Sequence, residues 1–480
     1  MTDASTSLPA PPVQAFRVAI PLVVGCAFFM EGLDSTMIAV SLPSMAETLG
    51  STALRLNLVI TTYLLSLAVF IPVSGWIADR YGTRRVFCAA VLVFATGSAL
   101  CGLSTSVPML LSMRVVQGFG GAMMTPVGRL ILLRSFPRAG LVSAMNWMTI
   151  PAMIGPTVGP IVGGLLTDYA TWRWIFFLNI PIGVLGGLLA LWLFEDYRAP
   201  SPTRFDVTGF VLVGLGLGLL EFGIENLGRP IVAPWAGYAF FAVSAAIFWL
   251  YGRHAKVTRS PVLDLDLFKI KTFRIGSLVG GMCRMGLDAT PVLLPLLFQI
   301  GFGMSPVQSG FLSFSSTLGA MAVRTFSRTI LRIAGFRKTL ILGAILSAGT
   351  TSAFALLHAH TPTVIIVGAV LISGCIRSIQ YLALNTISFA EVPAPLLSRS
   401  TSVSGVVQQV CRGFGVAIGA ALLAIVAGSH SVTVADFRIV FPLVGLIPLL
   451  SVLGFLRLNE SDGSEVSGYA SRNQDSSASP

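Results

Sequence analysis

Long apolar blocks separated by short polar loops make up most of the chain. About fourteen of these blocks approach or exceed the roughly 20 residues that an α-helix needs to cross a hydrocarbon core. The pattern predicts an all-α polytopic membrane protein with about 14 spans. The predicted spans cover residues 17–42, 56–78, 86–103, 108–133, 142–166, 174–194, 207–223, 235–251, 273–300, 307–325, 339–357, 364–389, 403–427 and 440–456.

Composition supports this prediction and limits what the charged residues can mean. Of the 480 residues, 54% are hydrophobic and only 11% are charged, whereas a soluble domain carries about 25% charged residues. The net charge of +11 comes from arginines and lysines scattered through alternate loops, so we expect no nucleic-acid partner. The positive-inside bias instead places these basic loops, and both termini, in the cytoplasm.

Three sequence features recur in the same order at a nearly constant offset, which predicts an internal duplication. The recurring pairs are Gly32–Thr36 with Gly286–Thr290, Gly82–Arg85 with Gly335–Lys338, and Gly159, Gly163 and Gly164 with Gly415, Gly419 and Ala420. We expect two six-helix bundles, with the substrate site between them near the membrane midplane. The predicted segments are a disordered N-terminus at 1–15, a first bundle at 16–195, two extra transmembrane helices with their loops at 196–272, a second bundle at 273–457 and a disordered tail at 458–480.

Two acids, Glu31 and Asp34, share one face of the first predicted span. A charge at that depth costs roughly 2.5–3.5 kcal/mol. It is therefore either a buried acid satisfied by a neighbouring helix or a proton or cation site. The duplication places Asp288 in the position equivalent to Asp34, with Arg284 four residues earlier as a neighbour that could neutralise it. For that reason we assign the proton to Asp34, with Glu31 tuning it.

Polar residues in the later spans supply candidate partners. Arg114 and Gln117 share one face of the fourth predicted span, and an arginine at that depth must be paired or hydrated. We predict a substrate cavity lined by Asp34, Arg284, Asp288, Arg377, Gln408 and Arg412. We identify no metal-ligand cluster, phosphate-binding loop or nucleophile–base set, so we expect no metal, no cofactor and no enzymatic activity.

The loop after the second predicted span reads Gly75-Trp-Ile-Ala-Asp79-Arg80-Tyr-Gly82-Thr-Arg84-Arg85. This run resembles a signature of the major facilitator superfamily. Glycine permits close packing and a tight turn there, and the acid lies at a helix terminus. In that family the loop gates the cytoplasmic side, and the resemblance implies that Asp79 and Arg84 latch the gate. The matching positions are Gly75, Asp79, Arg80, Gly82, Arg84 and Arg85.

Further motifs resemble the same family. The segment Arg114–Gly118 is similar to its fourth-helix motif, in which the arginine is tied to proton transfer; a purely structural arginine is the alternative. Leu33–Pro43 and Trp172–Gly183 resemble the fourteen-span drug:proton antiporter branch of MdtD-like and EmrB-like exporters. A fifth-helix segment resembles the antiporter motif, in which glycines make a face for close helix contact. Its matching positions are Gly155, Pro156, Gly159, Pro160, Gly163 and Gly164.

The resemblance covers about residues 16–456 and implies a proton-coupled antiporter that exports small amphipathic compounds by alternating access. It also implies a bacterial inner-membrane location, with protons, a small-molecule substrate and the lipid bilayer as partners, and a periplasmic adaptor and outer-membrane channel as further candidates. Two alternatives remain open. One is an exporter of an endogenous metabolite or organic acid, received by Arg284, Arg377 and Arg412. The other is a membrane sensor or assembly partner that transports nothing.

Overall fold

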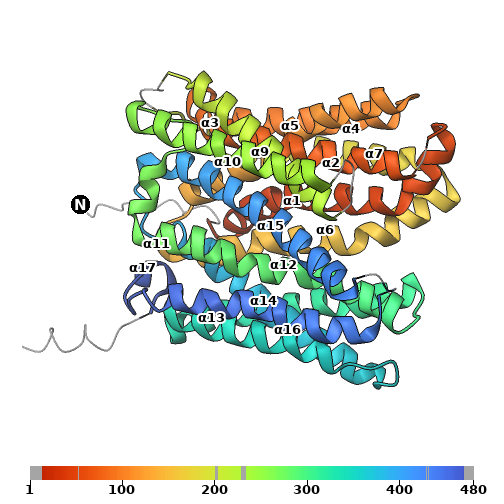
Figure 1. Ribbon diagram of the computed structural model, residues 1–480. Coiled ribbons are helices and arrows are strands. Elements are labelled where there is room, and N and C mark those ends of the chain that lie inside the picture. The colour runs from red at the N-terminus through yellow and green to blue at the C-terminus, as the bar shows by residue number, and fades with distance from the viewer. Residues whose placement is uncertain are drawn as a thin grey trace, which may run out of the picture.

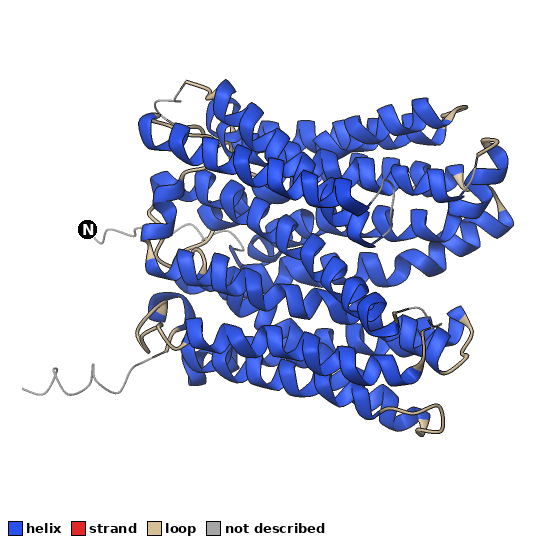
Figure 2. Cartoon of the chain, viewed as in Figure 1, coloured by secondary structure: helices blue, strands red, loops and turns tan. Residues whose placement is uncertain are grey.

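The computed structural model describes residues 13–51, 53–199, 204–228, 234–428, 430 and 432–469. Helices dominate this described part, and it contains no strand (Figure 2). The all-α fold is therefore as predicted. Most of the predicted disordered N-terminus lies outside the described residues, and residues 13–15 already belong to the first helix.

The first bundle consists of apolar helices joined by short turns. A glycine with φ of 99°, Gly82, separates α3 from α4, because the left-handed backbone at this turn favours a residue without a Cβ. Ser106 caps α5 by accepting a hydrogen bond from the backbone N–H of Met109. The helices are α1 (Val13–Thr48), α2 (Ala53–Phe70), α3 (Ser74–Tyr81), α4 (Thr83–Gly102), α5 (Val107–Ser135), α6 (Leu141–Tyr169), α7 (Arg173–Phe177) and α8 (Asn179–Leu193).

Two inserted helices precede the second bundle. Helix α12 is flanked by π-helical turns at Ile275–Val279 and Leu297–Gly301. The predicted spans 307–325 and 339–357 form one continuous helical stretch that bends at Gly335, where φ is 67°. The helices are α9 (Val207–Gly228), α10 (Pro234–Val257), α11 (Lys271–Arg274), α12 (Gly280–Leu296), α13 (Pro306–Ala353), α14 (Thr363–Ile387), α15 (Leu397–Ala427), α16 (Val434–Phe455) and α17 (Ser464–Ser467).

Ten helical stretches in the described part of the chain are long and apolar enough to cross a membrane. The 49-residue stretch Gln308–Leu356 would be about 70 Å long if straight, more than twice the roughly 30 Å of a hydrocarbon core. Its bend at Gly335 fits two crossings. Helices α5, α10 and α12 are long but fall outside these ten. The chain is a multi-pass membrane protein, and the count of fourteen spans stays a prediction.

Equivalent helices pack in the same way in the two bundles. Helix α1 lies along α6, and α12 lies along α15. Figure 1 shows α1–α8, coloured red to yellow, mainly above α12–α16, coloured green to blue, with α3, α11 and α17 at the same end of the molecule. The inserted helices pack against each other, and α9 also contacts α2 and α15. One continuous cluster of buried apolar residues reaches from α1 into the second bundle.

The C-terminal segment differs from its prediction. The stretch from Asn459 to Tyr469, predicted to be disordered, folds back onto the end of the molecule where α3 lies and carries α17. Its apolar anchor is Val466, which is only 2% exposed. Acidic side chains around this anchor pair with basic loops of both bundles, a pairing that the polar composition alone did not reveal. The ion pairs are Glu460 with Lys338 at 3.2 Å, Asp462 with Lys271 at 2.8 Å and Glu465 with Arg138 at 2.8 Å.

Candidate functional site

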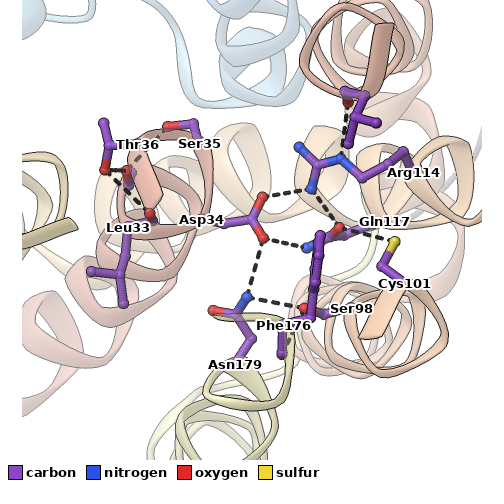
Figure 3. Close-up of polar contacts among 12 residues, drawn as sticks. Leu33, Asp34, Ser35, Thr36, Ser98, Cys101, Arg114, Gln117, Phe176 and Asn179 are labelled. Atoms are coloured by element: carbon purple, nitrogen blue, oxygen red, sulfur yellow. Dashed lines mark hydrogen bonds and ion pairs between the residues drawn. The ribbon is translucent and has the colours of Figure 1, made fainter. Parts of the chain in front are cut away.

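The carboxylate of Asp34 is enclosed by side chains from α5 and α8 of its own bundle (Figure 3). Its Oδ2 accepts a hydrogen bond from Nη1 of Arg114 at 2.6 Å. Its Oδ1 accepts from Nε2 of Gln117 at 2.9 Å and from Nδ2 of Asn179 at 3.2 Å. All four side chains are 0% exposed. Asp34 is thus an ion-paired acid, bonded at both oxygens and closed off from water.

The helix α5 presents the basic partner in a fixed orientation. Arg114 and Gln117 are three residues apart and therefore face the same side of α5, and Nη1 of the arginine also donates to Oε1 of Gln117 at 2.6 Å. Nε of Arg114 donates to the carbonyl oxygen of Val59 at 3.1 Å. The guanidinium lies 4.3 Å from the ring centre of Tyr63, a favourable cation–π geometry. These contacts hold the positive charge against Asp34.

Glu31 contacts a different part of α5, although it precedes Asp34 by only three residues. Its Oε2 accepts a hydrogen bond from Oγ1 of Thr125 at 2.7 Å. Arg412 and Arg129 both act on Glu31 electrostatically. Since Arg412 belongs to α15, Glu31 lies where the two bundles meet. The two acids of α1 therefore have separate environments, one sealed within the first bundle and the other half-buried at the interface.

The second bundle supplies its own polar groups at this interface. Oδ1 of Asp288 accepts a hydrogen bond from the Tyr381 hydroxyl at 2.5 Å. Arg284 donates to Oδ1 of Asn385 at 2.9 Å, and its guanidinium lies 5.0 Å from the Tyr381 ring centre. Gln408 joins the bundles, because its Oε1 accepts from Nη2 of Arg129 at 3.2 Å.

Two parts of the cavity prediction are wrong for this conformation. Asp34 does not face the second bundle, because its three partners all belong to the first. Arg284 and Asp288 do not form the ion pair that their spacing allowed. Each bonds to a residue of α14 instead, Arg284 to Asn385 and Asp288 to Tyr381. Four-residue spacing brings two side chains near each other, but it cannot exclude better partners on a facing helix.

At the end of the molecule that carries the predicted gate, α3 packs directly against α15. The N–H of Gly75 donates to Oγ of Ser402 at 2.9 Å, and Oγ of Ser398 donates to Oδ2 of Asp79 at 2.5 Å. A Cβ at Gly75 would lie only 2.5 Å from the carbonyl oxygen of Ser398. The two bundles are therefore closed against each other at this end.

The basic residues of the same motif lie outside that closed contact. Arg84, predicted to latch the gate together with Asp79, makes no hydrogen bond with α15 among the described residues; it donates to the carbonyl oxygen of Phe194, directly after α8, at 3.4 Å. Arg85 pairs with Asp196 at 3.5 Å, and a Cβ at Gly82 would collide with the same carboxylate. Arg80 stacks over a tryptophan ring on the preceding turn at 5.6 Å. These residues fix the turn, while the acid and the first glycine make the contact between bundles.

Three glycines of α6 allow α1 to approach closely. A Cβ at Gly155 would lie 2.5 Å from a carbonyl oxygen of α1, one at Gly163 would lie 2.9 Å from an α1 Cα atom, and one at Gly159 would collide with Thr36. Their four-residue spacing puts them on one face, as predicted. Gly164 is not on that face, since nothing lies within 4 Å of a Cβ built there. Pro160 is exposed, and Pro156 contacts Gly32 of α1.

Most partners of the predicted residues give no signal in the sequence. Only Asn179 carried a signal, since it lies within the Trp172–Gly183 motif. Thr125, Tyr381, Ser398 and Ser402 are single polar residues in apolar helices, where such residues are common. Over the residues that the structure describes, no group of three or more His, Cys, Asp or Glu side chains could hold a metal ion.

Comparisons with known proteins identify the family to which this chain is similar. The profile of the Major Facilitator Superfamily matches residues 24–420. A protein of Pectobacterium atrosepticum named "Putative multidrug resistance protein MdtD" is 36% identical over 411 residues, covering 85% of this chain and 87% of that protein. A protein of the same name from Salmonella heidelberg is 35% identical over 415 residues, with the same coverage.

Solved structures share the fold at low sequence identity. The human organic anion transporter MFSD10 superposes with a TM-score of 0.67 and 14% identity, covering 93% of this chain and 100% of that one. The proton:xylose symporter XylE, bound to 6-bromo-6-deoxy-D-glucose, superposes with a TM-score of 0.65 and 12% identity, covering 94% and 98%. Because the family profile spans most of the sequence and relatives above 30% identity extend along 85% of it, this chain belongs to the Major Facilitator Superfamily and is a membrane transporter of small molecules, not an enzyme.

Proposed function

We propose that this transporter is a proton-coupled antiporter that exports small amphipathic compounds from the cytoplasm by alternating access. Relatives that share 35–36% of their residues with it are named as multidrug resistance proteins. The observation that carries the proposal is the buried ion pair between Asp34 and Arg114, at 2.6 Å with both side chains 0% exposed. The proposed location is the bacterial inner membrane, with both termini in the cytoplasm.

The ion pair offers a physical basis for coupling. The carboxylate of Asp34 is bonded to one guanidinium and two amide groups. Water cannot reach it here, so proton transfer requires a second conformation in which α1 and α5 separate. A proton on Asp34 removes most of its attraction for Arg114, which is about 4 kcal/mol for unit charges 4 Å apart at an effective dielectric constant of 20. Gln117 orients the acid, and Glu31 tunes it from the bundle interface.

The contacts between α3 and α15 support a gate at the basic-loop end. By the positive-inside bias this end faces the cytoplasm, so the present conformation is closed on that side. Opening it must break the bonds of Gly75 and Asp79 to the two serines of α15. In this proposal Arg80, Gly82, Arg84 and Arg85 hold the turn beside the gate. The glycine face of α6 gives α1 a smooth surface along which it can shift.

Transport in proteoliposomes with an imposed pH gradient tests the proposal. We expect Asp34→Asn to abolish proton-driven efflux of an amphipathic dye and Glu31→Gln to reduce it, while a protonophore stops the wild-type protein. The matched control is Asp168→Asn, an identical substitution at an exposed site at the end of α6. Unchanged efflux in both acid variants would refute the mechanism. If the protein supports neither dye efflux nor a substrate-dependent proton flux, the alternative of a sensor without transport gains support.

A periplasmic adaptor and an outer-membrane channel are proposed as further partners, on the resemblance to exporter systems alone. Mild solubilisation of native membranes followed by affinity purification tests this part. Recovery of the transporter without any co-purifying periplasmic protein would argue for independent function.

A further inference from the structure

Four arginines from the membrane-spanning part gather where the two bundles meet. Arg129 comes from α5, and Arg284, Arg377 and Arg412 come from α12, α14 and α15. Arg129 and Arg284 are close enough to act on each other electrostatically. Arg284 and Arg377 both act on Tyr381. These four residues are called the arginine cluster below.

Fewer carboxylates than arginines face this cluster. The acids that act on Arg412 are Asp288 and Glu31, and Glu31 also acts on Arg129. None of the four arginines forms an ion pair within 4.0 Å of a described carboxylate. Glu221 of α9 also lies beside α15, because both of its carboxylate oxygens would be 3.3 Å from a Cβ built at Gly413, the residue after Arg412. Four guanidinium groups and three carboxylates of the described residues leave a surplus of one positive charge. Arg114, by contrast, is neutralised by its own acid at 2.6 Å.

Neutral groups take the hydrogen bonds of three cluster arginines. Arg412 makes no hydrogen bond with any described residue, and it is exposed although it sits at the middle of α15. Because it acts on Glu31 and Tyr63 of the first bundle, it points across the interface rather than toward lipid. The neutral acceptors are Gln408 for Arg129 at 3.2 Å, Asn385 for Arg284 at 2.9 Å and Ser316 for Arg377 at 2.9 Å.

Asp288 and Glu31 are themselves already bonded, which weakens them as receptors for a cation. Asp288 accepts from Tyr381 at 2.5 Å, and Glu31 accepts from Thr125 at 2.7 Å. A cation entering here would meet the positive surplus, whereas an anion would offset it. A guanidinium presents a planar fork of donors that matches a carboxylate, sulfonate or phosphate. The ring of Tyr381, which is only partly buried and lies 5.0 Å from the guanidinium of Arg284, offers an apolar surface nearby.

We infer that the cargo is an amphipathic organic anion whose carboxylate, sulfonate or phosphate binds Arg412 and Arg377, with its apolar body against the aromatic residues of the interface. Arg284 and Arg129 add positive charge behind that site. The inference deepens the proposed function and rests on it, because it names the charge of the exported compound. Among the two kinds of cargo left open by the sequence, it selects the organic acid over the lipophilic cation.

An anionic cargo also changes the electrical side of transport. A membrane potential that is negative inside drives an anion outward. When that anion leaves and a proton enters, each movement makes the inside more positive, so the potential drives both. Efflux in proteoliposomes should therefore accelerate when a potassium diffusion potential makes the compartment that holds the cargo negative.

Binding to the purified full-length protein tests the inference without requiring transport. The probes are butylbenzoate and butylphenyl-trimethylammonium, which share an apolar body and differ in charge. Isothermal titration calorimetry in detergent, with empty micelles subtracted, gives both affinities. We expect the benzoate to bind and the ammonium compound to bind at least about tenfold more weakly. Arg412→Gln and Arg377→Gln should each weaken benzoate binding at least about tenfold, as loss of a charge-assisted hydrogen bond implies.

Two matched variants keep this experiment interpretable. Arg412→Lys retains the charge but not the fork, so we expect intermediate affinity, which a misfolded protein would not show. Arg438→Gln removes an exposed arginine in the first turns of α16 and should leave benzoate affinity unchanged. Tighter binding of the ammonium compound, no benzoate binding, or wild-type benzoate affinity in both glutamine variants would overturn the inference. Benzoate binding with proton-independent transport would instead refute the proposed coupling and leave the anion site supported.

Discussion

The buried ion pair between Asp34 and Arg114 should contribute far more to stability as a pair than an exposed ion pair of similar length. In Arg114→Met the guanidinium is lost, and the Asp34 carboxylate keeps only the neutral donors of Gln117 and Asn179. In Asp34→Asn the guanidinium loses its counter-ion. In the double variant neither charge remains to be compensated. We therefore expect the two single substitutions to lower the free energy of unfolding by much more, when their effects are added, than the double substitution does.

The magnitude follows from burial. Removing one partner of a fully buried pair destabilises a protein by about 3–5 kcal/mol, whereas replacing both partners is often close to neutral. Since both side chains are 0% exposed, we expect a coupling free energy of at least about 3 kcal/mol. The ion pair of Arg138 with Glu465 is a control of similar length, 2.8 Å, but its side chains are 48% and 71% exposed. Its coupling free energy should be about 0–1 kcal/mol.

Double-mutant cycles for both pairs provide the measurement. The purified variants are unfolded in mixed micelles with a rising fraction of dodecyl sulfate, and tryptophan fluorescence and circular dichroism report the free energy of unfolding. A coupling free energy for Asp34 and Arg114 no larger than that of the exposed pair would refute the reasoning. It would mean that water or another charge reaches the site and replaces the missing partner.

Three further predictions concern helix packing and the closed end. Gly159→Ala adds a Cβ that collides with α1, so the free energy of unfolding in the same titration should fall by about 1–3 kcal/mol. Gly164→Ala, with open space around its Cβ, should change that free energy by less than about 0.5 kcal/mol. Equal effects of the two substitutions would contradict the packing argument. Gly75→Ala pushes against the Ser398 carbonyl, so spin labels on α3 and α15 should report a longer distance by electron paramagnetic resonance; an unaltered distance distribution would disprove the role of this contact as a gate. Truncation after Leu458 removes the ion-paired C-terminal segment. The full chain, but not the truncated one, should therefore lose thermal stability when the salt concentration rises to about 1 M. Equal salt responses would show that the ion pairs of this segment contribute nothing to thermal stability.

The fold could be predicted from sequence alone, because it depends on local patterns. The length of an apolar block predicts a membrane span, and a charge within it indicates a special environment. Arg114 and Gln117 could be placed on one helical face from their spacing. The duplicated glycines were equally informative, since Gly82 and Gly335 both adopt a positive φ at their turns.

The partners across helices could not be predicted in the same way. Asn179 lies 145 positions after Asp34, and no periodicity connects residues so far apart. Glu31 and Asp34 share a predicted face, yet a small rotation along α1 directs one to the bundle interface and the other into its own bundle. The charge that selects between cargo types, on Arg412, also depends on which acids the fold brings near it.

The C-terminal segment joins the two bundles at the closed end, since Glu465 pairs with the first bundle while Glu460 and Asp462 pair with the second. Two of the three ion pairs in this joint are exposed, so they respond to the surrounding ions, because the Debye length shrinks from about 10 Å at 0.1 M salt to about 3 Å at 1 M. Osmotic stress that concentrates the ions on that side would thus loosen the joint and ease opening of the gate. A fluorescent protein or affinity tag fused after Pro480 would follow this joint by only 11 residues, so untagged protein is the right reference for rates of the transport cycle.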